Sequence, residues 1–300
     1  MMKRKARSPA LLFSVGSALA LAIAVLAPVQ TANAAGPTTV GLGTAGSFAL
    51  LAGTGLTNTG ATTITGDVGS SPTHSETGFA ACPAADCVTL TGTNHNDPDP
   101  NDTVTQGAKT ALVAAYNSAF GKGPVTQTLS ALGGRTLVGG VYNSGDSTLG
   151  LTGTVTLDGQ NDPNSVWVFQ AQSDLVVATG GSVAFTRGAQ PCNVFWQVTS
   201  TATLGSGSSF AGSILALTSI TMGDGVALDG RAFARNGDVT LMHDTITRSA
   251  CRTATAPPTG TASTGSRDNS TPMLPLVMLA LAFGGLGLVA VDRRRRNLNI

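Results

Sequence analysis

Three short segments in the C-terminal half of the chain share one pattern of apolar and polar positions. In each segment apolar residues alternate with hydroxyl-bearing or acidic residues, as in a strand that buries one side. The apolar pairs are Ala202 and Leu204, Ile220 and Met222, and Val239 and Leu241. The polar residues that alternate with them are Thr201, Thr203, Ser219, Thr221, Asp238 and Thr240. The pattern predicts three strands with their hydroxyls on the exposed side.

These segments return at a nearly constant interval. The repeating units begin at Val194, Ser213 and Arg231. A unit this short cannot hold a core alone and must bury its apolar side against the next unit. Glycines between the strands provide sharp corners. The repeat therefore predicts a β-solenoid, in which coils stack about 4.8 Å apart and outward hydroxyls form a flat, regular array.

Earlier parts of the chain show the same composition with less regularity. Residues 41–71 are rich in Thr and Gly and alternate in the same way, so we expect one or two further coils there. Residues 72–102 contain prolines, two cysteines and the run NHNDPDPND, which is typical of an irregular cap. Trp167 and Trp196 are expected at the same place in consecutive coils, as buried or flanking aromatics rather than a platform for sugars.

One segment has helical rather than strand periodicity. Residues 103–120 place small and apolar side chains, including Leu112 and Ala115, three and four positions apart. Asp102 or Thr103 can cap the first turn through its side-chain oxygen, and glycines follow the last turn. The sequence predicts one amphipathic helix whose small apolar face lies close along a sheet.

The N-terminal residues have the composition of a targeting signal. Residues 1–34 combine a basic start, an apolar run and Ala32-Asn33-Ala34, the pattern of a cleaved secretory signal peptide. An uncleaved anchor is the alternative, but Ser14, Gly16 and Ser17 interrupt the apolar run. We expect export and a solenoid domain over residues 35–251.

The C-terminal residues have the composition of a stalk and an anchor. Residues 252–272 are rich in Pro, Thr, Ser and Gly and predict a linker without a core. Residues 273–291 form an uncharged, mostly apolar run of the length that spans a bilayer, and four arginines follow within residues 292–300. This arrangement predicts a transmembrane helix with a cytoplasmic C-terminal tail and the solenoid at the cell surface.

The same tail is compatible with attachment to a cell wall. Ala256-Pro-Pro-Thr-Gly260 and Thr261-Ala-Ser-Thr-Gly265 are similar to sortase signals, but both lack the leading leucine. We therefore expect a retained single-pass anchor, with removal by a sortase as the alternative.

Charge and cysteine content narrow the class of protein. Only 11% of residues are charged, and residues 35–272 hold nine Lys and Arg against fifteen Asp and Glu, which disfavours binding to nucleic acid. Four cysteines in an exported chain suggest two disulfides. The spacing favours Cys82 with Cys87 and Cys192 with Cys251, although four cysteines allow three connectivities.

The sequence offers little to catalysis or metal binding. It has no G-x-S-x-G, P-loop, C-x-x-C or H-E-x-x-H motif, and its three histidines are scattered. Asp97, Asp99 and Asp102 have oxygens that suit Ca²⁺, but the interleaved prolines favour a solvated turn. We expect no enzyme activity and no cofactor.

Several blocks, taken in order, resemble the microbial ice-binding protein family. They are LGTAGSFALLAGTGLTNTGATTITGDVG at residues 42–69, VWVFQ at 166–170, VFWQV with TATLG at 194–205, and GRAFARNGDVTLMHDTIT at 230–247. The resemblance implies a right-handed β-solenoid of triangular section, mainly all-β, with one long helix packed along a face. It also implies that the N-terminal segment stacks beside the C-terminal coils.

In that family a flat solenoid face with Thr-[Ala/Gly]-x-[Thr/Asn] repeats binds ice. Thr54-Gly55-Leu56-Thr57 matches the repeat, Thr218-Ser219-Ile220-Thr221 has Ser at the second position, and Asn236 to Thr240 has Asn first and one extra residue. The resemblance implies ice-binding residues at Thr54, Thr57, Thr199, Thr201, Thr203, Thr218, Ser219, Thr221, Asn236 and Thr240. Threonine suits such a face because β-branching stiffens its side chain.

Two functions follow as hypotheses. The first is a cell-surface ice-binding protein whose partner is the ice crystal, acting in adhesion or against recrystallisation. The alternative is a surface solenoid with a structural or polysaccharide-binding role, since threonine also simply favours strands.

Overall fold

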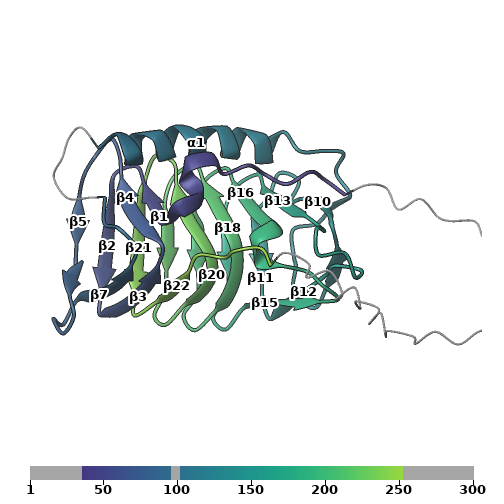
Figure 1. Cartoon of the computed structure of the whole chain (residues 1–300). Coiled ribbons are helices and arrows are strands. Elements are labelled where there is room, and N and C mark those ends of the chain that lie inside the picture. Colours follow the sequence, from purple (N-terminus) through teal and green to yellow (C-terminus); the bar gives the residue numbers. More distant parts are fainter. Residues whose placement is uncertain (1–35, 96–101, 253–300) are drawn as a thin grey trace, which may run out of the picture. The chain divides into compact units, whose positions relative to one another are not determined.

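The computed structural model describes residues 36–95 and 102–252, and within them nearly all regular structure is parallel β-strand. Successive coils stack strand on strand, and each complete coil contributes to three ladders of parallel strands (Figure 1). One α-helix and two short 3-10 helices, η1 (Gly43–Ser47) and η2 (Pro191–Asn193), complete these residues. The predicted mainly-β solenoid with a single long helix is confirmed.

The first ladder lies beneath the helix. Its spatial order is β8 (Gln127–Thr128), β10 (Gly140–Asn143), β13 (Trp167–Ala171), β16 (Val194–Val198), β18 (Ser209–Ala216), β20 (Ala227–Ala234), β1 (Phe48–Ala52) and β4 (Asp67–Ser70).

The second ladder is a separate seven-stranded sheet. Its spatial order is β11 (Leu149–Leu151), β14 (Leu175–Val177), β17 (Ala202–Leu204), β19 (Ile220–Met222), β21 (Asp238–Met242), β2 (Gly55–Thr59) and β5 (Glu76–Thr77).

The third ladder shares β18 and β20 with the first, because these two strands are long enough to turn from one ladder into the other. Its order is β9 (Thr136–Val138), β12 (Thr154–Asp158), β15 (Ser182–Thr186), β18, β20, β22 (Thr245–Thr247), β3 (Ala61–Thr65), β7 (Cys87–Thr91) and β6 (Ala80–Ala81). Glycine is required at the turn: Gly212 has φ +104°, and a Cβ on Gly230 would lie 1.9 Å from the Gly212 carbonyl oxygen.

The N-terminal strands join the C-terminal end of the stack. β1 pairs with β20, β2 with β21 and β3 with β22, so segments far apart in sequence form neighbouring coils. The helix α1 (Thr103–Phe120) then carries the chain across the first ladder to the opposite end (Figure 1). Its 18 residues span about 27 Å. The five intervals from β1 to β10 need about 24 Å, so the helix length matches the crossing.

The helix begins and packs as the sequence predicts. The Asp102 carboxylate accepts hydrogen bonds from the backbone N–H groups of Val104 and Thr105. Leu112 and Ala115 are fully buried in a hydrophobic cluster that includes Phe195 and Phe233 from the first ladder. Small residues such as Ala115 let the helix approach the strands closely.

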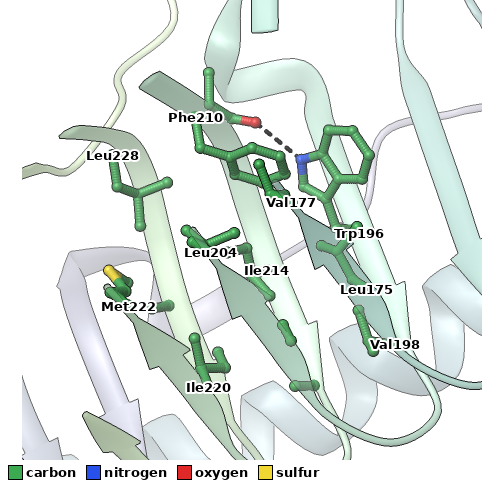
Figure 2. Packing of buried hydrophobic residues seen from close by; sticks show 14 of the residues in the cluster. Leu175, Val177, Trp196, Val198, Leu204, Phe210, Ile214, Ile220, Met222 and Leu228 are labelled. Atoms are coloured by element: carbon green, nitrogen blue, oxygen red, sulfur yellow. Dashed lines mark hydrogen bonds between the residues drawn. The ribbon is translucent and has the colours of Figure 1, made fainter. Parts of the chain in front are cut away.

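A second hydrophobic cluster fills the inside of the coils. The rings of Phe169 and Trp196 stack with centroids 4.1 Å apart. Trp196 Nε1 donates to the Ala211 carbonyl oxygen, the bond drawn as a dashed line in Figure 2. Trp167 is also fully buried, but its register partner is Val194 rather than Trp196. The expectation that the two tryptophans occupy the same place was therefore wrong, because the coil is shorter than the interval between them.

The register also adjusts the regular repeat. Phe195, rather than Val194, pairs with Ser213, so the interval from Phe195 to Ser213 equals the interval from Ser213 to its partner Arg231.

A second adjustment concerns the predicted irregular cap at residues 72–102. Within it, β5 and β7 continue two of the ladders, although Glu76 stands where an apolar residue would mark a strand. The polar composition of this segment concealed them.

Covalent and buried polar links tie the chain ends to the coils. Cys82 is bonded to Cys87 and Cys192 to Cys251, so the pairing that the spacing favours is confirmed. The buried Arg231 donates to the Gly46 carbonyl oxygen and to the Ser249 carbonyl oxygen. It thereby joins η1, β20 and the end of the described chain.

The predicted signal peptide, the linker beyond Arg252, the apolar run at residues 273–291 and the basic tail lie outside the described residues, as do Asp97 and Asp99. Within residues 36–95 and 102–252, no helix has both the length and the apolar composition needed to cross a bilayer.

Candidate functional site

A line of threonines crosses the exposed side of the seven-stranded sheet. Register pairing joins one residue from each of five adjacent strands. We call these residues the threonine row: Thr203, Thr221, Thr240, Thr57 and Thr77. Thr203, Thr221 and Thr77 are exposed, whereas Thr57 and Thr240 are half-buried. Val176 and Gly150 continue the line on the two remaining strands.

The strands beneath the row are fixed by the core. Ala202, Ile220, Val239 and Leu56 are register partners and are fully or almost fully buried. Because side chains alternate along a strand, this buried line holds the threonines on the opposite side. The row is therefore held by packing rather than by contacts among the threonines themselves.

Two carboxylates accept hydrogen bonds from the hydroxyls on the corner side of the threonine row. Thr201 Oγ1 donates to Asp174 at 2.7 Å, and Ser219 Oγ donates to Asp238 at 2.5 Å. Asp238 also accepts from Thr240 Oγ1 at 3.2 Å. The hydrogen bonds from the Thr201 hydroxyl and backbone N–H lower the pKa of Asp174 to about 2. Thr201 and Ser219 thus present hydroxyls that are already engaged.

The first positions of the predicted repeats lie at the corner before the sheet. The Gly237 N–H donates to the Thr218 carbonyl oxygen, and the Thr54 N–H donates to the Gly237 carbonyl oxygen. Gly237 therefore lies between Thr218 and Thr54 in the stacked coils, and Asn236 precedes it with its own N–H bonded to the Leu217 carbonyl oxygen. Thr54 and Asn236 are exposed, while Thr218 is half-buried.

Thr199 does not belong to this corner line. The Thr218 N–H donates to the carbonyl oxygen of Ser200, so Ser200 holds the corresponding position one coil earlier. Thr199 precedes it, is half-buried and accepts a hydrogen bond from Gln197 Nε2. The run of hydroxyl residues from 199 to 201 hid the correct register.

Sequence reasoning also missed Thr77 and Asp174. Thr77 follows Glu76, which breaks the apolar alternation that marks the other strands of the sheet. Asp174 lies in one of the longer coils, outside the regular repeat from which the site was predicted. The only available signal was the hydroxyl-rich composition of Ser75 to Thr77.

The spacing of the threonine row is close to distances in an ordered water network. Stacked strands place neighbouring row residues about 4.8 Å apart. Water oxygens in a tetrahedral network joined by hydrogen bonds of about 2.75 Å have second neighbours about 4.5 Å apart. The mismatch is small for each step, so adjacent threonines can contact second-neighbour waters. Across the two described ranges, no three His, Cys, Asp or Glu side chains form a group that could hold a metal ion.

The described faces also show no tryptophan or tyrosine platform. Both tryptophans and both tyrosines of the sequence are buried, Trp167 and Trp196 completely. The exposed ring of Phe120 belongs to the last residue of α1, outside the seven-stranded sheet.

Comparisons with known proteins agree with this architecture. The sequence profile of the family described as Ice-binding-like matches residues 50–247. An ice-binding protein of Nostoc sp. (strain HG1) is 43% identical over 226 residues, which are 75% of this chain and 79% of the relative. One of Flavobacterium frigoris (strain PS1) is 36% identical, covering 69% and 76%.

Solved structures give the same result. The crystal structure of an ice-binding protein from an Antarctic biological consortium has a TM-score of 0.66 and 41% identity, covering 71% of this chain and 92% of that chain. That of an ice-binding protein from the Antarctic ascomycete Antarctomyces psychrotrophicus has a TM-score of 0.64 and 39% identity, covering 71% and 100%. With its stacked parallel coils and the profile match across its coils, this chain belongs to the Ice-binding-like family.

Proposed function

We propose that this chain binds ice through the exposed side of the seven-stranded sheet. The observation that carries the proposal is the threonine row, which places five threonines in register on adjacent strands. Relatives named as ice-binding proteins, at 43% and 36% identity, support the choice of ligand. The row acts without a chemical step: hydroxyls and methyl groups hold water in ice-like positions.

Rigidity is the physical requirement for such binding. A flexible side chain would lose rotamer freedom on contact with a crystal, which opposes binding. Threonine loses little because its χ1 is already restricted, and the buried neighbours of Thr203, Thr221, Thr240 and Thr57 prevent those strands from shifting. The face therefore meets the crystal already ordered. In a right-handed solenoid of triangular section, this sheet would form one side of the triangle.

Uptake into growing ice tests the function directly. The full chain is expected to concentrate in a slowly growing ice front and to reshape single crystals, because adsorbed protein blocks growth at the bound planes. An unrelated β-rich protein of similar size serves as the control and should remain in the liquid. Exclusion of this chain from the ice to the same degree as the control would refute ice binding.

The setting of the protein is a separate part of the proposal. The predicted signal peptide at residues 1–34 and the apolar run followed by Arg293 to Arg296 support export and retention at the cell surface by a single membrane anchor. Held there, the ice-binding face would adhere cells to ice or oppose recrystallisation near the envelope.

Fractionation of the producing cells tests this attachment. Membranes should contain the protein with its residues 273–293 intact, because an apolar run of this length before four arginines is sufficient for an anchor. Mass spectrometry of the C-terminal peptide is the measurement. Recovery only from cell-wall digests, with an end at Thr259 or Thr264, would instead show removal of the tail by a sortase.

A further inference from the structure

A second array of threonines lies on the third ladder, away from the seven-stranded sheet. Three adjacent strands, β22, β3 and β7, each carry threonines two positions apart, and all six side chains are exposed. We call these residues the second threonine face: Thr245 and Thr247, Thr63 and Thr65, and Thr89 and Thr91. Register pairs them in two parallel lines, so they form a two-dimensional grid.

The hydroxyls of this grid are less engaged than those beside the threonine row. Among the residues that the structure describes, Thr89 Oγ1 donates weakly to Cys82 Sγ at 3.5 Å, and the other five hydroxyls make no side-chain hydrogen bond. By contrast, the hydroxyls of Thr201, Ser219 and Thr240 donate hydrogen bonds to Asp174 or Asp238. The second threonine face therefore leaves its hydroxyls available to water.

A buried polar clamp holds the strands beneath the grid. Asp244 accepts hydrogen bonds from the backbone N–H groups of Val226 and Met242, and its own N–H donates to Thr62 Oγ1. Asp244 and Thr62 are buried, and Ile246 and Ile64 pack in register beside them. The clamp fixes β20, β22 and β3 relative to one another, so the threonines above them are rigidly spaced.

The grid fits a water lattice in two directions. Along the stack its spacing of about 4.8 Å is close to the second-neighbour distance of about 4.5 Å in a tetrahedral water network. Along each strand, two residues span about 6.6 Å, against a stacking repeat of eight thirds of the hydrogen bond, about 7.3 Å, in hexagonal ice. The larger mismatch occurs only once, because each strand contributes two threonines.

The borders of the grid are also defined. The next strand, β20, presents Ala227 and Asp229 beside Thr245 and Thr247, so the hydroxyl lines end there. At that border a pocket of about 400 Å³ lies between β15, β18 and β20. Thr245 and Thr247 lie on the edge of this pocket. Flatness is therefore limited to β22, β3 and β7, where the described grid carries no charged side chain.

We infer that the second threonine face is a second ice-binding surface of this chain. The inference rests on the proposed function for its ligand, but it uses different residues from a different ladder. The two surfaces meet at the turns from β2 to β3 and from β21 to β22, so a single flat crystal plane cannot contact both fully. The protein would adsorb to ice in two orientations and on two sets of planes.

The test uses tyrosine substitutions in the full chain, labelled with a fluorophore and allowed to adsorb to a single ice crystal. Thr65→Tyr places a bulky ring on the middle strand of the grid, and Thr247→Tyr repeats the change on the neighbouring strand. Thr221→Tyr alters only the threonine row. Thr110→Tyr, on the exposed side of α1, is the matched control. Urea unfolding and circular dichroism establish that each variant is folded.

We expect Thr65→Tyr and Thr247→Tyr each to lose labelling of one set of ice planes and Thr221→Tyr to lose labelling of another set. The double variant that combines Thr65→Tyr and Thr221→Tyr should lose all labelling. Labelling by Thr65→Tyr and Thr247→Tyr that equals that of Thr110→Tyr would overturn the second surface while leaving the proposed function intact. Complete loss with Thr221→Tyr alone would overturn it as well. Absence of labelling by the unsubstituted chain would overturn both.

Discussion

Carboxylates decide which hydroxyls of the seven-stranded sheet remain available. Asp174 and Asp238 are half-buried at the corner side of the threonine row and accept hydrogen bonds from neighbouring hydroxyls. These bonds fix the rotamers of Thr201 and Ser219, and they place negative charge next to the threonine row that we propose binds ice. At the scale of single residues the face is therefore a compromise between rigidity and neutrality.

The ionisation of Asp174 makes this bonding measurable. Its pKa of about 2 lies below the ordinary value of 3.8, so the bonds contribute stability above pH 4 that is lost as the pH falls towards 2. After solvent screening we expect the contribution to be about 1 kcal/mol. Asp174→Asn should lower the free energy of unfolding by that amount at pH 7 and by much less at pH 2. Urea titrations at both pH values measure the difference, and an equal effect at both would refute the assignment.

The helix α1 is the element that makes the discontinuous stack possible. It returns the chain from the N-terminal coils to the far end of the ladder, and it covers the apolar outer side of the first ladder. Leu112 is fully buried in that contact, whereas Val104 on the same helix is 50% exposed. Packing of the apolar stripe, rather than helix propensity, must therefore supply most of the stability of the helix.

Truncation of the buried stripe tests this contribution. Leu112→Ala should cost about 2–4 kcal/mol in the free energy of unfolding, because it removes buried methyl groups and leaves a cavity. The matched change Val104→Ala should cost less than about 0.5 kcal/mol, as expected for an exposed position. Chemical denaturation of the two variants provides the comparison. A Leu112→Ala cost no greater than that of Val104→Ala would show that the helix is not part of the cooperative core.

Sequence periodicity identified the coils that repeat at a regular length, but it missed the residues that are inserted between or within the other coils. The coils that contain β19 and β21 are short, so alternation and glycine spacing revealed them. The coil that begins at Trp167 is longer than the regular repeat and includes η2, yet it is shorter than the interval from Trp167 to Trp196, so the two tryptophans are out of register. Thr89 and Thr91 follow the Cys82–Cys87 loop, and the surrounding polar residues made this part resemble an irregular cap.

Considered as a whole, the described unit keeps two threonine surfaces on one rigid core. The candidate row could be predicted from the repeats ending in Thr57, Thr221 and Thr240, since these share one motif. The second threonine face could not, because its pairing joins strands from opposite ends of the described chain, such as Thr63 with Thr245. Only the stacking of N-terminal on C-terminal coils brings these residues together.

The central claim is that the threonine row contacts ice, and a single substitution in its middle tests it most directly. Thr221→Tyr keeps a strand-favouring residue at an exposed position, so the fold should survive while the flat row is interrupted. Thermal hysteresis and ice-crystal shape are measured for this variant, the unsubstituted chain and Thr110→Tyr, at equal concentration and with unfolding midpoints checked. We expect a clear fall in thermal hysteresis and an altered crystal shape for Thr221→Tyr alone. Hysteresis and shaping identical to those of Thr110→Tyr in a folded Thr221→Tyr chain would contradict the claim.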